Sequence, residues 1–408
     1  MKEGEAMATI TLKLRLYPNQ QQANLLEATM QQYQLACNLV STYYFEHNFK
    51  PNQSDLQKHL YHLIRNKFGL KAQMTESTFK TVLARYKAIN TQLRQSPYHF
   101  KDNNTNQWYT EKRDLGWLQK PINFKRPQCD LVRNNDWSFV KDQLSINTLG
   151  KREKVNYTAK GFEKYFKLGK LGTAKLVKSC GHYFLHVACT LETPSFSKTN
   201  LKHVVGIDRG LRFLTTVYGE KGTTSFVSGK SVIIKRRKYK RLRQQLQSKG
   251  TKSAKRRLKK IGQRENRWMS DINHQVTKAL VDKYGRGTVF TIEDLTNVRF
   301  ATEKVAKTNR YEQVSWAFYQ FEQFLTYKAE MMDSTVVKVD AYYTSQRCPK
   351  CGVVDKQARN HATHEYHCEH CGYTSNDDRI GAMNIQLLGT NWVTDKSTSF
   401  KQVKSNEE

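Results

Sequence analysis

Two cysteine pairs in the last quarter of the chain place the strongest constraint on how it folds. Cys348-Pro-Lys-Cys351 and Cys368-Glu-His-Cys371 are two C-x₂-C motifs separated by 16 residues. Each motif forms a tight turn that directs two thiolates at one ion, and two such turns complete the tetrahedral ligand set of zinc. The spacing therefore predicts one structural Cys₄ zinc site. Because all four positions are filled, this site has no open position for catalysis.

Two alternatives remain open for these cysteines. They could be free thiols, or a histidine from the same loop could replace one of them; the candidates are His361, His364, His367 and His370. The chain has eight cysteines in all. The other four are scattered, which favours packing in hydrophobic cores; they are Cys37, Cys129, Cys180 and Cys189.

The charge of the chain restricts its partners. Its 408 residues include 68 Lys and Arg against 36 Asp and Glu, a formal net charge of +32. A surplus of this size points to a polyanion, of which nucleic acid is the commonest, and argues against an enzyme of small metabolites. No stretch is long and apolar enough to resemble a membrane span.

The densest charge lies in residues 235–267, with 16 Lys and Arg and one acid, Glu265. A sparse apolar stripe and a break at Gly250 predict a helical hairpin. The hairpin is either a solvated surface or a phosphate-binding one, and the self-repulsion of its charge favours phosphate. The candidate nucleic-acid contacts are Lys235, Arg236, Arg237, Lys238, Lys240, Arg241, Arg243, Lys255, Arg256, Arg257, Lys259 and Lys260.

Hydrophobic periodicity divides the first 200 residues. Residues 9–17 alternate as a half-buried strand, and from residue 20 to 95 apolar side chains recur every three to four positions, as in helices. Residues 96–130 are polar and contain three prolines, which predicts an irregular connector. Residues 135–200 return to alternation. We expect a small β-barrel that includes the first strand and is interrupted by a helical block.

From about residue 201 the pattern changes to alternating strands and helices, which predicts an α/β domain up to residue 390. The fold class expected for the whole chain is therefore α+β with several domains. The expected strands are 204–208, 213–218, 224–227, 288–293 and 335–339, and the expected helices beyond the basic hairpin are 311–331 and 378–388.

Three acids stand at the ends of elements in this acid-poor chain. Asp208 and Glu293 each end a buried strand, and Asp378 begins the last helix. A carboxylate at such a place is costly unless a cation accompanies it. If the three converge, they form a divalent metal site suited to two-metal phosphodiester hydrolysis. The alternative is that each acid is a helix cap or the partner of a basic side chain.

Aromatic side chains next to basic ones admit two interpretations. They could stack on bases, but core packing is the more common role. The examples are Tyr43-Tyr-Phe45, Tyr86-Lys87 and Trp137-Ser-Phe139.

Five motifs together resemble the transposon-encoded TnpB proteins, relatives of the type V CRISPR nucleases, over nearly the whole chain. They are Leu16-Tyr-Pro-Asn19, Gly206-Ile-Asp-Arg-Gly210, Ile292-Glu-Asp-Leu295, Tyr342-Tyr-Thr-Ser-Gln346 and Asn376-Asp-Asp-Arg-Ile-Gly-Ala-Met-Asn384. The resemblance implies an RNase H-like (RuvC) nuclease domain with an inserted zinc ribbon. It assigns Asp208, Glu293 and Asp378 to the active site and the four motif cysteines to the ribbon.

The resemblance also implies a choice between neighbouring acids. The family pattern places the acid six residues before the Asn of the final helix, and counting from Asn384 gives Asp378. Asp377 is then expected to cap or support the site, and Asp294 to face away from Glu293. Arg379 is left with two roles, a contact to the scissile phosphate or a plain ion pair.

The function implied is RNA-guided cleavage of double-stranded DNA next to a short motif, directed by a transposon-derived guide RNA. The implied cofactors are Mg²⁺, as two ions at the acids, and structural Zn²⁺. The partners would be guide RNA and target DNA, with the protein a monomer in the cytoplasm, nucleoid-associated when bound to DNA. The alternatives are a catalytically silent RNA-guided repressor and a guide-free transposase or nuclease of the same fold.

The expected domain plan follows from these assignments. A β-barrel, or wedge, is expected to contain residues 1–19 and 131–200, with a helical recognition block and connector at 20–130. The nuclease is expected at 201–345 and 377–390, the zinc ribbon at 346–376 and a flexible tail at 391–408.

Overall fold

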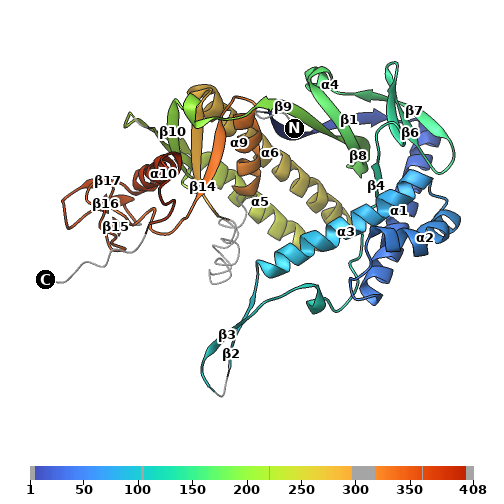
Figure 1. Ribbon diagram of the computed structural model, residues 1–408, viewed down its shortest axis with the longest axis horizontal. Helices are drawn as coiled ribbons and strands as arrows, with labels where there is room; N and C mark the ends of the chain where they lie inside the picture. Colours follow the sequence, from blue (N-terminus) through green and yellow to red (C-terminus); the bar gives the residue numbers. More distant parts are fainter. Residues whose placement is uncertain (1–4, 103–104, 220, 296–317, 361, 401–408) are drawn as a thin grey trace. The chain divides into compact units, whose positions relative to one another are not determined.

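The computed structural model describes residues 5–102, 105–219, 221–295, 318–360 and 362–400. The chain folds as two compact units, one of Thr9–Leu191 and the other of Met1–Ala8 together with Glu192–Glu408 (Figure 1). In the described ranges, no helix has both the length and the hydropathy needed to cross a membrane.

A seven-stranded sheet organises the first unit. Its order is β4-β8-β9-β1-β7-β6-β5, a nearly closed, barrel-like sheet that confirms the expected barrel. The alternation that predicted β9 is seen in its burial, since Leu185, Val187 and Cys189 are fully buried. A short helix, α4 (Glu163–Leu168), precedes β8. The strands are β1 (Glu5–Tyr17), β4 (Gln128–Leu131), β5 (Trp137–Val140), β6 (Gln143–Asn147), β7 (Arg152–Thr158), β8 (Gly169–Ser179) and β9 (His182–Pro194).

Three helices follow β1 and form the expected helical block: α1 (Gln20–Glu46), α2 (Gln53–Phe68) and α3 (Ala72–Arg94). Asn19 caps α1 in a capping box with Gln22, which satisfies backbone N–H groups that the first turn leaves open. Tyr86 and Trp137, two of the aromatic residues considered for base stacking, are buried in the core instead.

The prediction of an irregular connector is wrong at two places. Residues 98–111 contain a two-stranded antiparallel hairpin, β2 (Tyr98–Lys101) with β3 (Trp108–Glu111), followed by a 3₁₀ turn at Leu115–Trp117. Both strands are exposed along their whole length. Tyr98-His-Phe100-Lys101 does alternate aromatic with polar side chains, but each strand has only four residues, the shortest run that predicts a strand, and lies in an otherwise polar segment.

The second unit contains a five-stranded sheet of order β12-β11-β10-β13-β14. Strands β10, β13 and β14 are parallel, and β11 and β12 extend the sheet as an antiparallel meander. The expected strands are all present, so the mixed α/β prediction is confirmed. They are β10 (His203–Asp208), β11 (Phe213–Gly219), β12 (Thr224–Ser228), β13 (Thr288–Glu293) and β14 (Thr335–Val339).

Helices cover both faces of this sheet. Val204 and Val289 pack against α10, whereas the next residues along the strands, Val205 and Phe290, pack in a separate core with α6 and α9. Successive side chains of a strand point to opposite faces of the sheet. The sheet is therefore a middle layer, with α10 on one face and α6 and α9 on the other. The helices are α5 (Lys230–Lys249), α6 (Lys252–Tyr284), α9 (Phe318–Glu330) and α10 (Asp377–Val393).

Two expected segments extend beyond the described residues. The predicted helix 311–331 is described from Phe318 onward, and residues 311–317 lie outside the described part. Of the predicted flexible tail, residues 401–408 are likewise outside it. Residues 391–400 differ from the prediction, because α10 continues to Val393 and Phe400 packs against the α10 core.

A small insertion connects β14 to α10. Its three short antiparallel strands are β15 (Arg359–Asn360), β16 (Glu365–His367) and β17 (Thr374–Asn376). The two cysteine motifs flank β15 and β16.

Candidate active site and cysteine cluster

Asp208 and Glu293 lie at the carboxyl ends of neighbouring strands. Ile207 on β10 pairs with Ile292 on the parallel strand β13, so the acids that follow them stand at the same level of the sheet. Helix α10 lies directly on this end of β10. A Cβ added at Gly381 would be 2.7 Å from Oδ2 of Asp208. The Asp208 carboxylate therefore contacts the start of α10, the helix that carries Asp378 in its first turn.

The first turn of α10 gives its two aspartates different surroundings. The N-cap is Asn376, whose side chain accepts a hydrogen bond from the Arg379 N–H. Asp377 is fully buried; its Oδ2 accepts a bond from Nε of Arg359 at 2.8 Å, and its Oδ1 accepts one from the Asp378 N–H at 2.9 Å. Asp377 is thus an anchor for the insertion and not the helix cap. The Asp378 side chain keeps 15% exposure.

Glu293 is held by the segment that follows β14. Oγ1 of Thr344 donates to Oε1 of Glu293 at 2.5 Å, and the Thr344 carbonyl in turn accepts from Nδ2 of Asn384 at 2.8 Å. The buried Arg209 guanidinium donates to the Glu293 backbone carbonyl at 2.5 Å. These contacts fix the orientation of Glu293 and place a positive charge behind it.

Burial makes all three acids costly to ionise, and at Asp208 the charges of the other two add to that cost. Burial, then the charges of Glu293 and Asp378, raise the pKa of Asp208 well above its usual range. Burial also raises the pKa of Glu293, against the hydrogen bond from Thr344. Burial and the neighbouring Asp377 raise the pKa of Asp378. Because like charges in low dielectric repel, a cation among these groups would stabilise their ionised forms.

These residues fit a divalent cation. Oδ2 of Asp378 is buried and has no hydrogen-bond partner, an arrangement that is costly unless an ion or water occupies it. Carboxylate oxygens are the ligands that Mg²⁺ prefers. The oxygens of the three acids do not all lie within 4.8 Å of one another, whereas ligand atoms of His364, Asp377 and Asp378 do. The guanidinium of Arg359 contacts Asp377 at 2.8 Å and lies 3.7 Å from Oδ1 of Asp378, so a cation bound by Asp378 in either group would share that carboxylate with a fixed positive charge.

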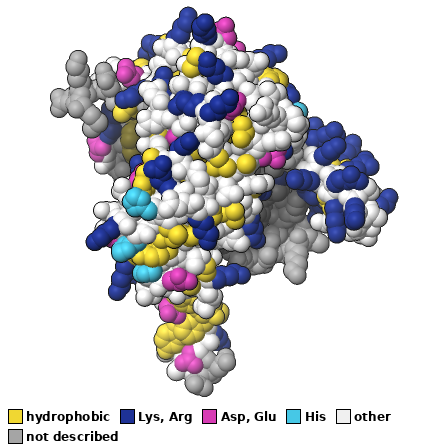
Figure 2. All heavy atoms as spheres, turned by 90° about the vertical axis from the view of Figure 1, so that its right-hand side faces the viewer, with side chains coloured by type: hydrophobic (Ala, Val, Ile, Leu, Met, Phe, Trp, Pro, Cys, Tyr) yellow, Lys and Arg dark blue, Asp and Glu magenta, His cyan; other side chains and the backbone are white. Residues whose placement is uncertain are grey.

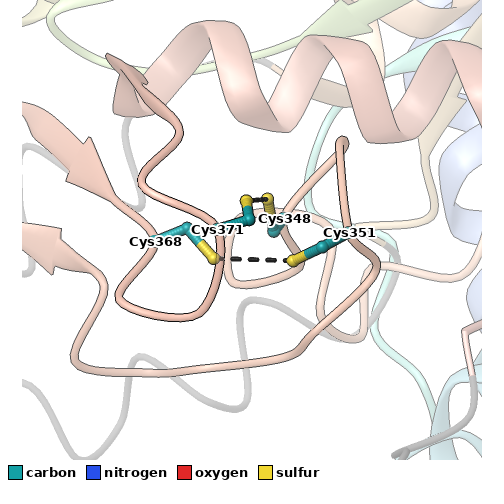
Figure 3. A group of neighbouring side chains, drawn as sticks. All are labelled: Cys348, Cys351, Cys368 and Cys371. Atoms are coloured by element: carbon teal, nitrogen blue, oxygen red, sulfur yellow. Dashed lines mark hydrogen bonds between the residues drawn. The ribbon is translucent and has the colours of Figure 1, made fainter.

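The four motif cysteines meet as the sequence predicts. Their sulfur atoms all lie within 4.8 Å of one another. The Sγ atoms of Cys348 and Cys371 are 3.6 Å apart, and those of Cys351 and Cys368 are also 3.6 Å apart (Figure 3). Four thiolates bound to one zinc at ~2.3 Å are about 3.8 Å apart in a tetrahedron. The cluster therefore has the donor set and the size that zinc requires.

The environment favours a thiolate at Cys348, whereas burial raises the pKa of Cys351 and Cys368. Burial acts to raise the pKa of Cys348, but backbone N–H groups of Cys351 and Lys350 outweigh it and lower the pKa to about 7. Among the described residues, the group around these sulfurs contains no histidine. His364 instead approaches Asp377, with Nδ1 3.4 Å from its Oδ2. His361, another of the alternative ligands, lies outside the described residues.

The basic hairpin forms as expected, with α5 and α6 joined at Gly250. One predicted nucleic-acid contact is corrected by the structure. Arg236 is 6% exposed and pairs with the equally buried Glu265, because the lone acid of the segment lies inside the hairpin. Arg243 also pairs with Glu265. Lys240 is half-buried, and the remaining candidates are exposed: Lys235, Arg237, Lys238, Arg241, Lys255, Arg256, Arg257, Lys259 and Lys260.

Two residues near the acids were given no role from the sequence. Arg359 belongs to no predicted pattern, whereas Thr344 lies in the motif Tyr342-Tyr-Thr-Ser-Gln346; both reach the acids through the tertiary fold. Asp294, exposed beyond the end of β13, pairs with Lys338 at 3.7 Å. Arg379 donates to the hydroxyls of Thr224, Tyr373 and Ser375 at 2.9 to 3.1 Å, so its guanidinium is tied to neutral groups.

Comparisons with known proteins fall on the same segments. The family model "Cas12f1-like, TNB domain" matches residues 318–385, and the OrfB (IS605) model, described as "Probable transposase", matches residues 186–298. Together these segments include Asp208, Glu293, Asp378 and all four motif cysteines.

Curated relatives match part of the chain. A TnpB-like protein of Acanthamoeba polyphaga mimivirus is 28% identical over 48% of this chain and 39% of its own length. The CRISPR-associated endodeoxyribonuclease Cas12f1 of Sulfoacidibacillus thermotolerans is 36% identical over 28% of this chain and 26% of its own. The chain therefore spans well under half the length of these relatives.

One solved structure resembles the whole chain in fold. The mini-RNA-guided endonuclease CRISPR-Cas phi3 has a TM-score of 0.52 at 11% identity, covering 98% of this chain and 94% of its own. At that identity the likeness is one of fold. Over the matched segments, the family models and curated relatives make this chain similar to TnpB-like proteins and to the Cas12f1 endodeoxyribonucleases.

Proposed function

We propose that this chain is an RNA-guided DNA endonuclease with a RuvC-like active site. The observation that carries the proposal concerns three acids: Asp208 and Glu293 end neighbouring strands, and Asp208 contacts the helix that carries Asp378 in its first turn. All three belong to a chain of net charge +32 whose family relatives include a CRISPR-associated endodeoxyribonuclease. A half-buried acidic site in a basic protein is suited to a polyanionic substrate cut with the help of bound cations.

Asp208, Glu293 and Asp378 would hold Mg²⁺, which supplies an activated water and stabilises the leaving oxygen of the phosphodiester. The chain's own residues prepare this site. Thr344 orients Glu293 through its hydroxyl. Gly381 leaves room for the Asp208 carboxylate against α10. The sheet and helix thereby hold all three acids before any substrate binds.

The cysteine cluster would hold structural zinc and fix the insertion. Arg359 and His364 extend from this insertion to Asp377, next to the active-site Asp378. Zinc would then support the acids indirectly, by keeping Arg359 in place. The same proposal assigns roles to the rest of the chain. Residues 1–19 and 131–200 would form the wedge, and residues 20–130 the recognition block. The basic hairpin would contact guide RNA or the guide–target duplex.

The experiment begins with sequencing RNA that co-purifies with the protein, followed by cleavage of a target library with that RNA in Mg²⁺. Guided cutting next to a short motif is expected, and Asp208→Ala should abolish it while RNA still co-purifies. Cleavage that needs no RNA would favour a guide-free nuclease. Guided binding without cutting by the wild-type protein would favour a repressor.

Zinc is tested separately by metal analysis. The purified protein should contain one zinc ion per chain, and Cys348→Ser should lose it. Full zinc content in that variant would contradict the assignment. Cys180→Ser, at an exposed cysteine outside the cluster, is the matched control.

A further inference from the structure

The hairpin of β2 and β3 presents a ladder of exposed aromatic rings. The Trp117 ring lies 5.5 Å from that of Tyr98, Tyr98 lies 5.7 Å from Phe100, and Phe100 lies 5.7 Å from Tyr109, measured between centroids. All four side chains are between 37% and 47% exposed. Phe100 pairs directly with Tyr109 across the strands, so the rings share one face of the hairpin.

This ladder forms no part of a described core. The two strands pair only with each other, and every residue in them is exposed. In Figure 2, hydrophobic side chains gather just above the lowest grey atoms, at the height where Figure 1 draws β2 and β3. An isolated two-stranded hairpin is marginally stable in water, and an exposed aromatic face of this kind is typical of an interaction surface.

The composition of the hairpin indicates what it contacts. From Tyr98 to Asp114 the sequence has no Ala, Val, Ile, Leu or Met, so the apolar surface of the hairpin consists of flat rings. Residues 98–117 carry three bases and three acids, and the three bases that follow, Lys120, Lys125 and Arg126, give the adjoining segment a surplus that complements phosphate. Flat rings with basic neighbours suit unpaired bases, since every base has a π-face that can stack.

We propose that the ladder of Tyr98, Phe100, Tyr109 and Trp117 binds unpaired RNA by stacking on its bases. RNA presents unpaired bases in loops and ends, whereas duplex DNA must first be opened. The proposal rests on the RNA partner of the proposed function but not on cleavage. The Arg113 guanidinium, which donates to the Ser96 carbonyl at 2.5 Å, holds the base of the hairpin so that the ladder is presented as one surface.

The test uses the full chain, a short fluorescein-labelled oligouridine and ultraviolet cross-linking. Wild-type protein should cross-link within residues 98–117. The double variant Phe100→Leu with Tyr109→Leu keeps apolar bulk but removes two π-faces. It should lose that cross-link and bind roughly ten-fold or more weakly. The slope of affinity against salt should stay unchanged, because stacking releases no counterions.

The matched control is His99→Leu with Thr110→Leu, the pair directly opposed on the other face of the same hairpin. It should bind oligouridine like wild type. Thermal unfolding of both variants should also match wild type, since the hairpin lies outside the cores. The Asp208→Asn variant should bind normally, so a failure of the nuclease proposal would leave this result intact.

Three results would overturn the proposal. One is equal oligouridine binding by the ladder variant and wild type. Another is a hairpin cross-link with oligothymidine DNA and none with RNA, which would assign the surface to DNA. The third is self-association of the wild-type protein in sedimentation, lost in the ladder variant while RNA binding stays unchanged. That result would make the hairpin a protein-docking surface.

Discussion

The Asp208 carboxylate lies against a helix position that has room only for glycine. A Cβ at Gly381 would stand 2.7 Å from Oδ2 and 3.1 Å from Cγ of this short side chain. We expect Gly381→Ala to displace the carboxylate and lower the guided cleavage rate by at least about ten-fold, since small misplacements of reacting groups are costly. Single-turnover cleavage measures this effect.

Gly262→Ala is the control for that change. Gly262 is also within a helix, α6, but a Cβ there meets nothing within 4 Å. The control should cut normally and gain about 0.5–1 kcal/mol of stability from the better helix former. If Gly381→Ala cut as fast as this control, the close approach of Asp208 to α10 would have no catalytic importance.

Asp208 also predicts a dependence of stability on pH. Its pKa is raised in the folded protein by burial and by Glu293 and Asp378, so folding favours its protonated form. The stability that this provides is full below the unfolded pKa of about 3.9 and is lost as pH rises through the folded pKa. Without metal, Asp208→Asn should therefore melt at a higher temperature than wild type at neutral pH.

Calorimetry with and without Mg²⁺ tests this account. The difference in melting temperature should disappear in acid, where Asp208 is protonated, and Mg²⁺ should raise the melting temperature of wild type more than that of Asp208→Asn. Equal melting temperatures at neutral pH would mean that Asp208 is not under repulsion. A catalytic acid that destabilises the metal-free fold is a common cost of function.

At the level of elements, the basic hairpin is fastened by its lone acid. Glu265 on α6 pairs with Arg236 and Arg243 on α5, and both Glu265 and Arg236 are nearly fully buried. Removing one partner of such a pair leaves a buried charge uncompensated. Glu265→Gln should lower the free energy of unfolding by up to about 3–5 kcal/mol, as measured by urea denaturation.

Arg264→Gln, at the adjacent exposed position, is the control and should change stability by less than about 0.5 kcal/mol. It still removes one charge from the surface. If both variants unfolded alike, Glu265 would be a spectator and the hairpin would be held by its apolar stripe alone.

Sequence patterns predicted the elements that bury at least one face. Strands β13 and β14 match their predicted bounds because their apolar runs are packed on both sides. Hairpin β2–β3 was missed because neither face is buried. The same limit applies to the site: an acid at the end of a strand is visible in sequence, but the contact of Arg359 with Asp377 is set by how the insertion folds back onto α10.

Across the whole molecule, charge is distributed unevenly, which bears on the proposed binding of nucleic acid. Residues 235–267 supply 16 bases and one acid, or +15 of the net +32. The structure refines this count, because Arg236 and Glu265 neutralise each other in the interior. The acids that would hold Mg²⁺ are half-buried at the end of the sheet, whereas most of the hairpin's bases face solvent, so under the proposed function binding and cutting would depend on different parts of the second unit.

This division predicts how RNA binding responds to salt. Replacing Arg256, Arg257 and Lys260, all exposed on the first half of α6, with Gln should make the slope of log affinity against log salt less steep by about 2 to 3, since each lost phosphate contact removes ~0.7–0.9. The same charge change at Lys278, Lys283 and Arg286, exposed at the other end of α6 or just beyond it, should leave the slope nearly unchanged. Filter binding across a salt series measures both. An equal reduction in the two variants would mean that RNA senses the total charge of the protein and not the hairpin that concentrates it.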